Sequence, residues 1–96
     1  MAIDKGLMSK RDEILRVAGR YGAENVRVFG SRAHGEARPE SDVDLLVTVG
    51  ERTSLLDIVA IKQDLEDLLG STVHLVTEDA ISPYLRDKVL RESVPL

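Results

Sequence analysis

A long helical pattern stands between two strand-like runs, and this order restricts the fold more than any other feature of the sequence. Residues 55–69 place leucine and isoleucine at intervals of three and four, with Thr53-Ser54 as the expected cap and Gly70 as the expected end. The flanking runs 42–49 and 72–76 are rich in aliphatic and β-branched residues, which is typical of strands. Two strands joined through a whole helix favour parallel pairing by a right-handed crossover.

The remaining elements complete a small domain. Residues 9–12 resemble an N-cap serine with a carboxylate three residues on, and they precede apolar residues at helical spacing that end at Gly22. Residues 25–29 predict a strand whose link to the run 42–49 is short enough for antiparallel pairing. Ser82-Pro83 predicts a last helix that runs to about Glu92. The expected fold class is α/β (α+β): one domain of residues 1–96 with a small mixed three-stranded sheet and helices packed on one face.

Composition excludes several classes of protein. The chain has no cysteine, which rules out a disulfide scaffold and a cysteine-ligated zinc site. A net charge of -4 argues against direct binding of nucleic acid, which needs a basic face. No run approaches the roughly 20 apolar residues of a membrane helix, so we expect a cytoplasmic protein that does not enter the membrane. An acidic protein can still bind a nucleotide if a metal ion supplies positive charge.

The stretch 28–49 carries the chemistry-bearing residues. Asp42 and Asp44 share one face of their strand, about 6.6 Å apart along it, while Val43, Leu45 and Val47 face the helix-covered side. Two neighbouring carboxylates repel each other, and a divalent cation relieves that repulsion. Mg²⁺ suits such a pair, because it binds through a few carboxylate oxygens and completes its shell with water and substrate phosphates.

The Gly-Ser pair at the end of the first strand adds a second half to this site. In an antiparallel pair, Gly30 and Ser31 come beside the start of the strand that carries the aspartates. Glycine allows a ligand to approach the backbone, and the N-terminus of a turn offers N–H groups to a phosphate. Arg32 is close enough in sequence to help hold the phosphates. Carboxylates for a metal beside a phosphate cradle indicate metal-dependent phosphoryl or nucleotidyl transfer.

These residues resemble a known family. The stretch "GSRAHGEARPESDVDLLV" is similar to the signature of minimal nucleotidyltransferase (MNT) domains of the DNA polymerase β-like superfamily, and the tail "EDAISPYLRDKVLRESVPL" resembles that of MNT antitoxins paired with HEPN-domain toxins. The resemblance implies a nucleotidyltransferase fold. It also implies an enzyme that uses Mg²⁺ (Mn²⁺ being the alternative) and ATP to transfer AMP to a tyrosine of a HEPN toxin. Such an antitoxin would form a hetero-oligomer with the toxin.

The same resemblance assigns the site residues. Gly30 and Ser31 would hold the triphosphate of the nucleotide, and Asp42 and Asp44 would coordinate the metal. The family usually has a third acid on the strand after the long helix, and here His74 stands at that place. Strand alternation directs His74 toward the aspartates. It is either a catalytic or phosphate-facing group or a residue without a catalytic role.

Three functions stay open on the sequence. The first is the protein adenylyltransferase antitoxin described above. The second is a catalytically weak or inactive MNT antitoxin that neutralises the toxin by binding alone, for which His74 is the motive. The third is the nucleotide-binding subunit of a small-molecule nucleotidyltransferase. Tyr84 and Leu85 in the last helix fit either a core position or a surface for a partner.

Overall fold

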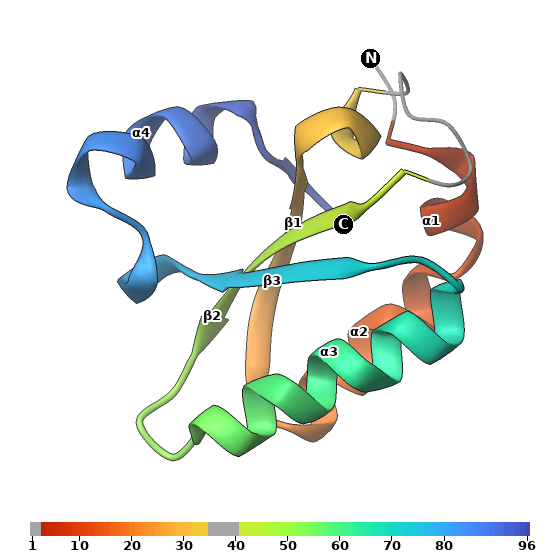
Figure 1. Cartoon of the computed structure of the whole chain (residues 1–96), viewed down its shortest axis with the longest axis horizontal. Helices are drawn as coiled ribbons and strands as arrows, with labels where there is room; N and C mark the ends of the chain where they lie inside the picture. Colours follow the sequence, from red (N-terminus) through yellow and green to blue (C-terminus); the bar gives the residue numbers. More distant parts are fainter. Residues whose placement is uncertain (1–2, 35–40) are drawn as a thin grey trace.

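The sheet has four strands and is covered on one side by two helices (Figure 1). The structure is a computed structural model, and it describes residues 3–34 and 41–96. The elements in chain order are α1 (Lys5–Ser9), α2 (Arg11–Arg20), β1 (Ala23–Phe29), the 3₁₀ turn η1 (Gly30–Ala33), β2 (Val43–Val49), α3 (Leu55–Leu69), β3 (Val73–Thr77), the 3₁₀ turn η2 (Glu78–Ala80), α4 (Pro83–Glu92) and β4 (Val94–Pro95). The mixed α+β class is confirmed.

The strand order is β3-β2-β1-β4. β2 pairs with β3 in parallel and with β1 in antiparallel, as the lengths of the connections predict. The prediction of three strands is wrong by one, because residues 94–95 pair with β1 as a fourth strand. Two residues, one of them proline, are too short for an alternating pattern, and proline is tolerated in an edge strand.

The crossover helix α3 begins and ends where its sequence predicts. The Ser54 hydroxyl accepts a hydrogen bond from the Asp57 amide at 3.2 Å, and the Asp57 carboxylate accepts one from the Ser54 amide at 2.9 Å. This reciprocal pair satisfies two amides that a helix start leaves without partners. Gly70 ends the helix with φ +68°, which a residue without Cβ adopts at little cost.

The N-terminal region differs from its prediction. Ser9 ends the short helix α1 and its hydroxyl donates to the Gly6 carbonyl at 2.8 Å, so it does not cap α2. Asp4 caps α1 instead, and its carboxylate accepts from the Leu7 amide at 3.2 Å. α2 starts after Lys10 without a side-chain cap. Two helices separated by one residue give a continuous helical pattern, which explains the missed boundary.

The main core lies between the sheet and the pair α2 and α3. Val43, Leu45 and Val47 of β2 are buried there, as their alternation predicts. Leu46 points to the opposite side and is also fully buried, although it does not belong to that core cluster. α4 connects the two edge strands β3 and β4, lies apart from α2 and α3, and buries none of its residues (Figure 1). Tyr84 on α4 is 94% exposed, so it is not a core residue.

No helix in the described part of the chain is long and apolar enough to cross a membrane.

Candidate active site

Three neighbouring strands bring the predicted site residues other than Arg32 into one row. Phe29 at the end of β1 is opposite Asp44 of β2, and Asp44 is in register with His74 of β3. Residues that pair across strands share one face of a sheet. Gly30 and Ser31 follow Phe29 directly, so the Gly-Ser pair and the aspartates meet at one end of the sheet, on the side away from α2 and α3.

Gly30 packs directly against the Asp44 carboxylate. Its φ of +71° is in the left-handed region, and a Cβ built on it would overlap Asp44 Oδ2 and come within 3.2 Å of Cγ. Both the backbone conformation and the space therefore require glycine here. The next residue, Ser31, is exposed and belongs to the first part of η1. The residue before this turn, Phe29, makes no side-chain hydrogen bond to the amides at the start of the turn.

Asp42 and His74 form a half-exposed pair beside this contact. His74 Nε2 lies 2.9 Å from Asp42 Oδ2, and the two side chains are 52% and 56% exposed. When the imidazole is protonated, the contact is an ion pair. Exposure to water weakens such a pair, so its main effect is to orient the two side chains beside each other. The prediction that His74 points toward the aspartates is confirmed.

Burial raises the pKa of the Asp44 carboxyl group above its ordinary value. The negative charge of Asp42 also raises this pKa, while the positive charge of protonated His74 lowers it. Burial is the largest of the three effects. The ionised form of Asp44 is therefore held at some cost to folding, which a cation bound beside it would offset.

The carboxylates of the candidate site suit a metal ion whose remaining coordination positions are filled by water and by the substrate. In residues 3–34 and 41–96 no group of three or more histidine, cysteine or acidic side chains could hold a metal ion by itself. Two carboxylates remain, those of Asp42 and Asp44. Mg²⁺ is often bound in this way, through one or two carboxylates together with waters and substrate phosphates. The residues present thus suit Mg²⁺ that arrives with a nucleotide.

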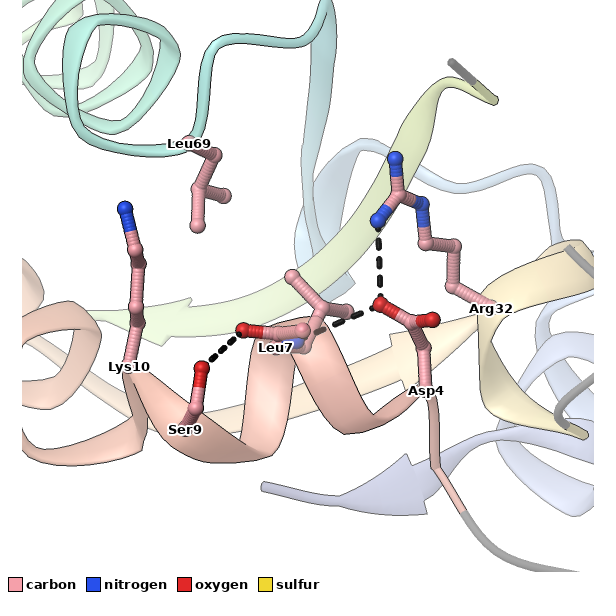
Figure 2. A pocket seen from close by; sticks show the side chains of 7 residues that line it. Asp4, Leu7, Ser9, Lys10, Arg32 and Leu69 are labelled. Atoms are coloured by element: carbon pink, nitrogen blue, oxygen red, sulfur yellow. Dashed lines mark hydrogen bonds and ion pairs between the residues drawn. The ribbon is translucent and has the colours of Figure 1, made fainter. Parts of the chain in front are cut away.

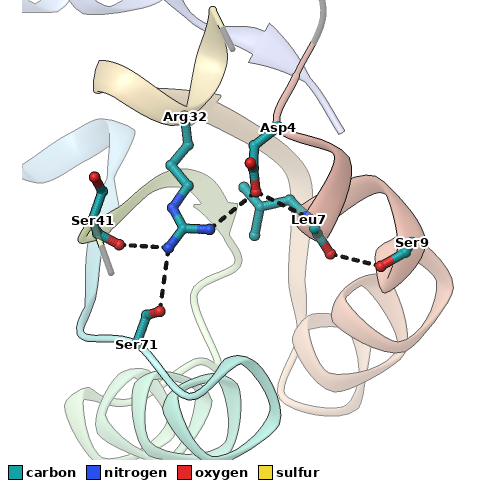
Figure 3. A network of polar contacts seen from close by, with 7 residues as sticks. Asp4, Leu7, Ser9, Arg32, Ser41 and Ser71 are labelled. Carbon is teal, nitrogen blue, oxygen red and sulfur yellow. Dashed lines mark hydrogen bonds and ion pairs between the residues drawn. The ribbon is translucent and has the colours of Figure 1, made fainter. Parts of the chain in front are cut away.

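Arg32 is placed differently from its prediction. The sequence predicts a phosphate contact, whereas the structure buries the guanidinium and directs it to Asp4, Ser41 and Ser71 (Figure 3). Sequence reasoning missed this network. Its members lie up to 39 residues from Arg32 along the chain, so no local pattern joins them. The one available signal was Asp4 itself, a capping residue before the short helical stretch 5–9.

A pocket of about 330 Å³ lies beside this network (Figure 2). None of Gly30, Ser31, Asp42, Asp44 or His74 lines it. The pocket is therefore separate from the row of site residues. Its lining residues are Asp4, Gly6, Leu7, Ser9, Lys10, Arg32 and Leu69.

Comparison with known proteins assigns the family. The model of the nucleotidyltransferase domain matches residues 11–96. A solved structure named provisionally as a minimal nucleotidyltransferase is 48% identical, superposes with a TM-score of 0.88, and covers 98% of this chain and 97% of its own. The chain therefore belongs to the nucleotidyltransferase domain family, and the predicted enzyme class and fold are confirmed.

Two further comparisons concern a protein adenylyltransferase and an antitoxin in complex with its toxin. The protein adenylyltransferase MntA of Thermococcus cleftensis is 43% identical over 75 residues, which are 78% of this chain and 76% of that protein. A structure of a tri-AMPylated Shewanella oneidensis HEPN toxin in complex with MNT antitoxin superposes with a TM-score of 0.71. It is 20% identical and covers 92% of this chain and 69% of that one, so it shows a shared fold alone.

Replacing Gly30 tests the contact with Asp44. In Gly30→Ala the added methyl group overlaps the carboxylate, and the left-handed backbone itself costs roughly 1–2 kcal/mol for a residue with Cβ. Gly70→Ala is the matched control, because Gly70 has nearly the same φ but no atom within 4 Å of a built Cβ. Urea unfolding should show a larger loss of stability for Gly30→Ala. Equal losses would contradict the close contact.

The raised pKa of Asp44 predicts that Asp44→Asn stabilises the chain without metal. A carboxyl group whose pKa is higher in the folded state lowers stability once pH exceeds that pKa, and this penalty disappears below the unfolded value. Thermal unfolding at pH 7 should give a higher Tm for the variant than for the parent chain. The difference should shrink as pH falls toward about 4. A lower Tm at pH 7 would refute the assignment.

Proposed function

We propose that this chain is a protein adenylyltransferase that transfers AMP from ATP to a tyrosine hydroxyl of a HEPN-domain toxin and thereby acts as its antitoxin. The observation that carries the proposal is the row formed by Asp44, its neighbour Asp42 and the Gly30 backbone, because two carboxylates beside the start of a turn suit a metal ion and the phosphates of a nucleotide. The MntA relative, at 43% identity, supports the acceptor class. The neighbour in complex with an AMPylated HEPN toxin has the same fold and supports the partner.

The proposed reaction is a single displacement at phosphorus. The phenolic oxygen of the acceptor attacks the α-phosphorus of ATP, the bond from that phosphorus to the bridging oxygen breaks, and pyrophosphate leaves with the bonding electrons. The phenolic proton passes to water or to a nearby base. Mg²⁺, when bound, neutralises the negative charge that develops on the phosphates. Asp42 and Asp44 would hold it.

The remaining side chains orient the reactants. Gly30 and Ser31 would receive the triphosphate at the start of η1, where backbone amides suit an anion. His74 would stand beside Asp42 on the exposed side of the row, where the acceptor hydroxyl approaches. The acceptor tyrosine must come from another molecule, and the proposed hetero-oligomer with the toxin supplies it.

Incubation with the toxin tests the proposal. The chain, ATP, Mg²⁺ and a purified HEPN partner should yield a toxin heavier by one or more AMP units on tyrosine, as read by mass spectrometry. Asp44→Asn should abolish the modification, because the charge that binds the metal is lost. Glu13→Gln is the matched control, since this exposed carboxylate lies on α2, on the other side of the sheet from the row, and its change to an amide should leave transfer unchanged. An unmodified toxin in the presence of bound ATP would refute the catalytic proposal.

A second candidate rests on His74 at the position of the expected third acid. In this alternative the chain neutralises the toxin by binding alone, and the row of site residues is a remnant. The double variant Asp42→Ala with Asp44→Ala would then still rescue cells from the toxin. Loss of rescue by a folded double variant would remove this alternative.

Substitutions at His74 measure its part in the reaction. If the imidazole assists transfer, His74→Ala should lower the rate by about 10²-fold or more, the lower range for the loss of a general acid or base. His74→Asp should preserve or raise the rate with Mg²⁺, since it restores an oxygen ligand beside Asp42. Single-turnover AMP transfer under saturating ATP gives both rates. Equal rates for the three proteins would show that the position is catalytically idle.

A further inference from the structure

The guanidinium of Arg32 joins three separate segments of the chain, and we infer that Arg32 is a positioning residue of the nucleotide site. The side chain is 7% exposed. Nη1 donates to Asp4 Oδ2 at 3.0 Å, and Nη2 donates to the Ser41 carbonyl at 2.6 Å and to Ser71 Oγ at 3.2 Å (Figure 3). The inference rests on the proposed function, because it concerns how that site is held.

Each contact lies next to a residue of the site. Arg32 itself follows Ser31 in η1, and its partner Ser41 directly precedes Asp42. Ser71 stands three residues before His74, where the chain enters β3. One side chain therefore fastens the turn that carries the Gly-Ser pair to the starts of both strands that carry the remaining site residues.

The backbone ladder pairs Phe29 with Asp44 but stops one residue before η1, so it does not itself hold the turn. The Val43 amide donates to the Thr72 carbonyl at 2.9 Å and holds the start of β2 beside the start of β3. That bond keeps Asp44 and His74 level with each other. The guanidinium ties η1, which carries Arg32 itself, to the chain just before β2 and just before β3. A displacement of about 1 Å at a reacting group can cost about 10²-fold in rate, so this fastening matters for transfer.

Asp4 completes the arrangement from the opposite side. Its carboxylate balances the buried positive charge of Arg32 and at the same time caps α1 through the Leu7 amide. The Asp4 amide also donates to the Arg32 carbonyl at 2.9 Å. The guanidinium is therefore held in one orientation, with its second nitrogen directed at Ser41 and Ser71.

A planar fork is required for this geometry. Two separate nitrogens of Arg32 serve acceptors on different sides, whereas lysine offers one nitrogen at the end of a flexible chain. Arg32→Lys keeps the positive charge opposite Asp4 but cannot reach Asp4, Ser41 and Ser71 together. The substitution therefore separates the fastening role from the charge.

Binding of Mg²⁺ with a non-hydrolysable ATP analogue, measured by calorimetry, tests the inference. Arg32→Lys should weaken binding at least tenfold at a temperature where the variant is fully folded by circular dichroism. Lys10→Met is the matched control. Lys10 lines the same pocket and donates to the Leu68 carbonyl at 2.7 Å, so its hydrogen bond goes to the end of α3 and to none of the described site residues (Figure 2). The Lys10→Met variant should have a lower Tm, and its affinity for the ATP analogue should stay within twofold of that of the parent chain.

Two results would overturn the inference: unchanged affinity in Arg32→Lys, or an equal loss of affinity in Lys10→Met. If Arg32→Lys does not fold, Ser71→Ala removes one acceptor of the fork and should weaken binding in the same direction by a smaller factor. Unchanged binding in Ser71→Ala would then count against the inference.

A second readout needs no nucleotide and separates this inference from the proposed function. In the chain without ligands, Arg32→Lys should shift the nitrogen resonances of the His74 imidazole and the carboxyl carbon resonance of Asp44, although neither side chain touches Arg32. Lys10→Met should leave both in place. Unmoved resonances in Arg32→Lys refute the positioning role. A parent chain that fails to bind ATP refutes the proposed function, while the resonances still decide the role of Arg32.

Discussion

The contact between the Gly30 backbone and the Asp44 carboxylate is the constraint on which the site depends. It requires a residue without Cβ at the end of β1, a left-handed backbone there, and an antiparallel register that places Asp44 opposite Phe29. The Asp44 carboxylate at this contact is partly buried, and this burial raises its pKa. One contact thus links the choice of a glycine, the pairing of two strands and the electrostatics of a metal ligand.

The fold could be predicted from the sequence where the signal was local. The capping pair Ser54 and Asp57, the glycine that ends α3 and the apolar alternation of β2 each act within a few residues, and each was found. Residues 94–95 and the short helix α1 were missed, because two paired residues or one helical turn carry too little pattern. The row of site residues was found because strand alternation and the two connection lengths determine which side chains share a face.

The partners of Arg32 could not be predicted, and the reason is physical. An arginine near a Gly-Ser pair suits a phosphate equally well on sequence grounds, and its actual direction depends on a carboxylate 28 residues earlier in the chain. Only the folded arrangement decides between the two. Within the stretch 30–32, Gly30 packs against the Asp44 carboxylate, Ser31 is exposed, and Arg32 is buried and directed to Asp4, Ser41 and Ser71.

The alternation of β2 has a consequence for misfolding. Asp42 and Asp44 face the site while Val43, Leu45 and Val47 fill the core, and a slip of one residue between strands would exchange these two sets. Such a slip would bury two charges and expose three aliphatic side chains, which is unfavourable on both counts. A chain with the wrong alignment would therefore be unstable as well as inactive. Cellular proteolysis, which removes unstable chains, would act on the same molecules that have lost the arrangement of their acids.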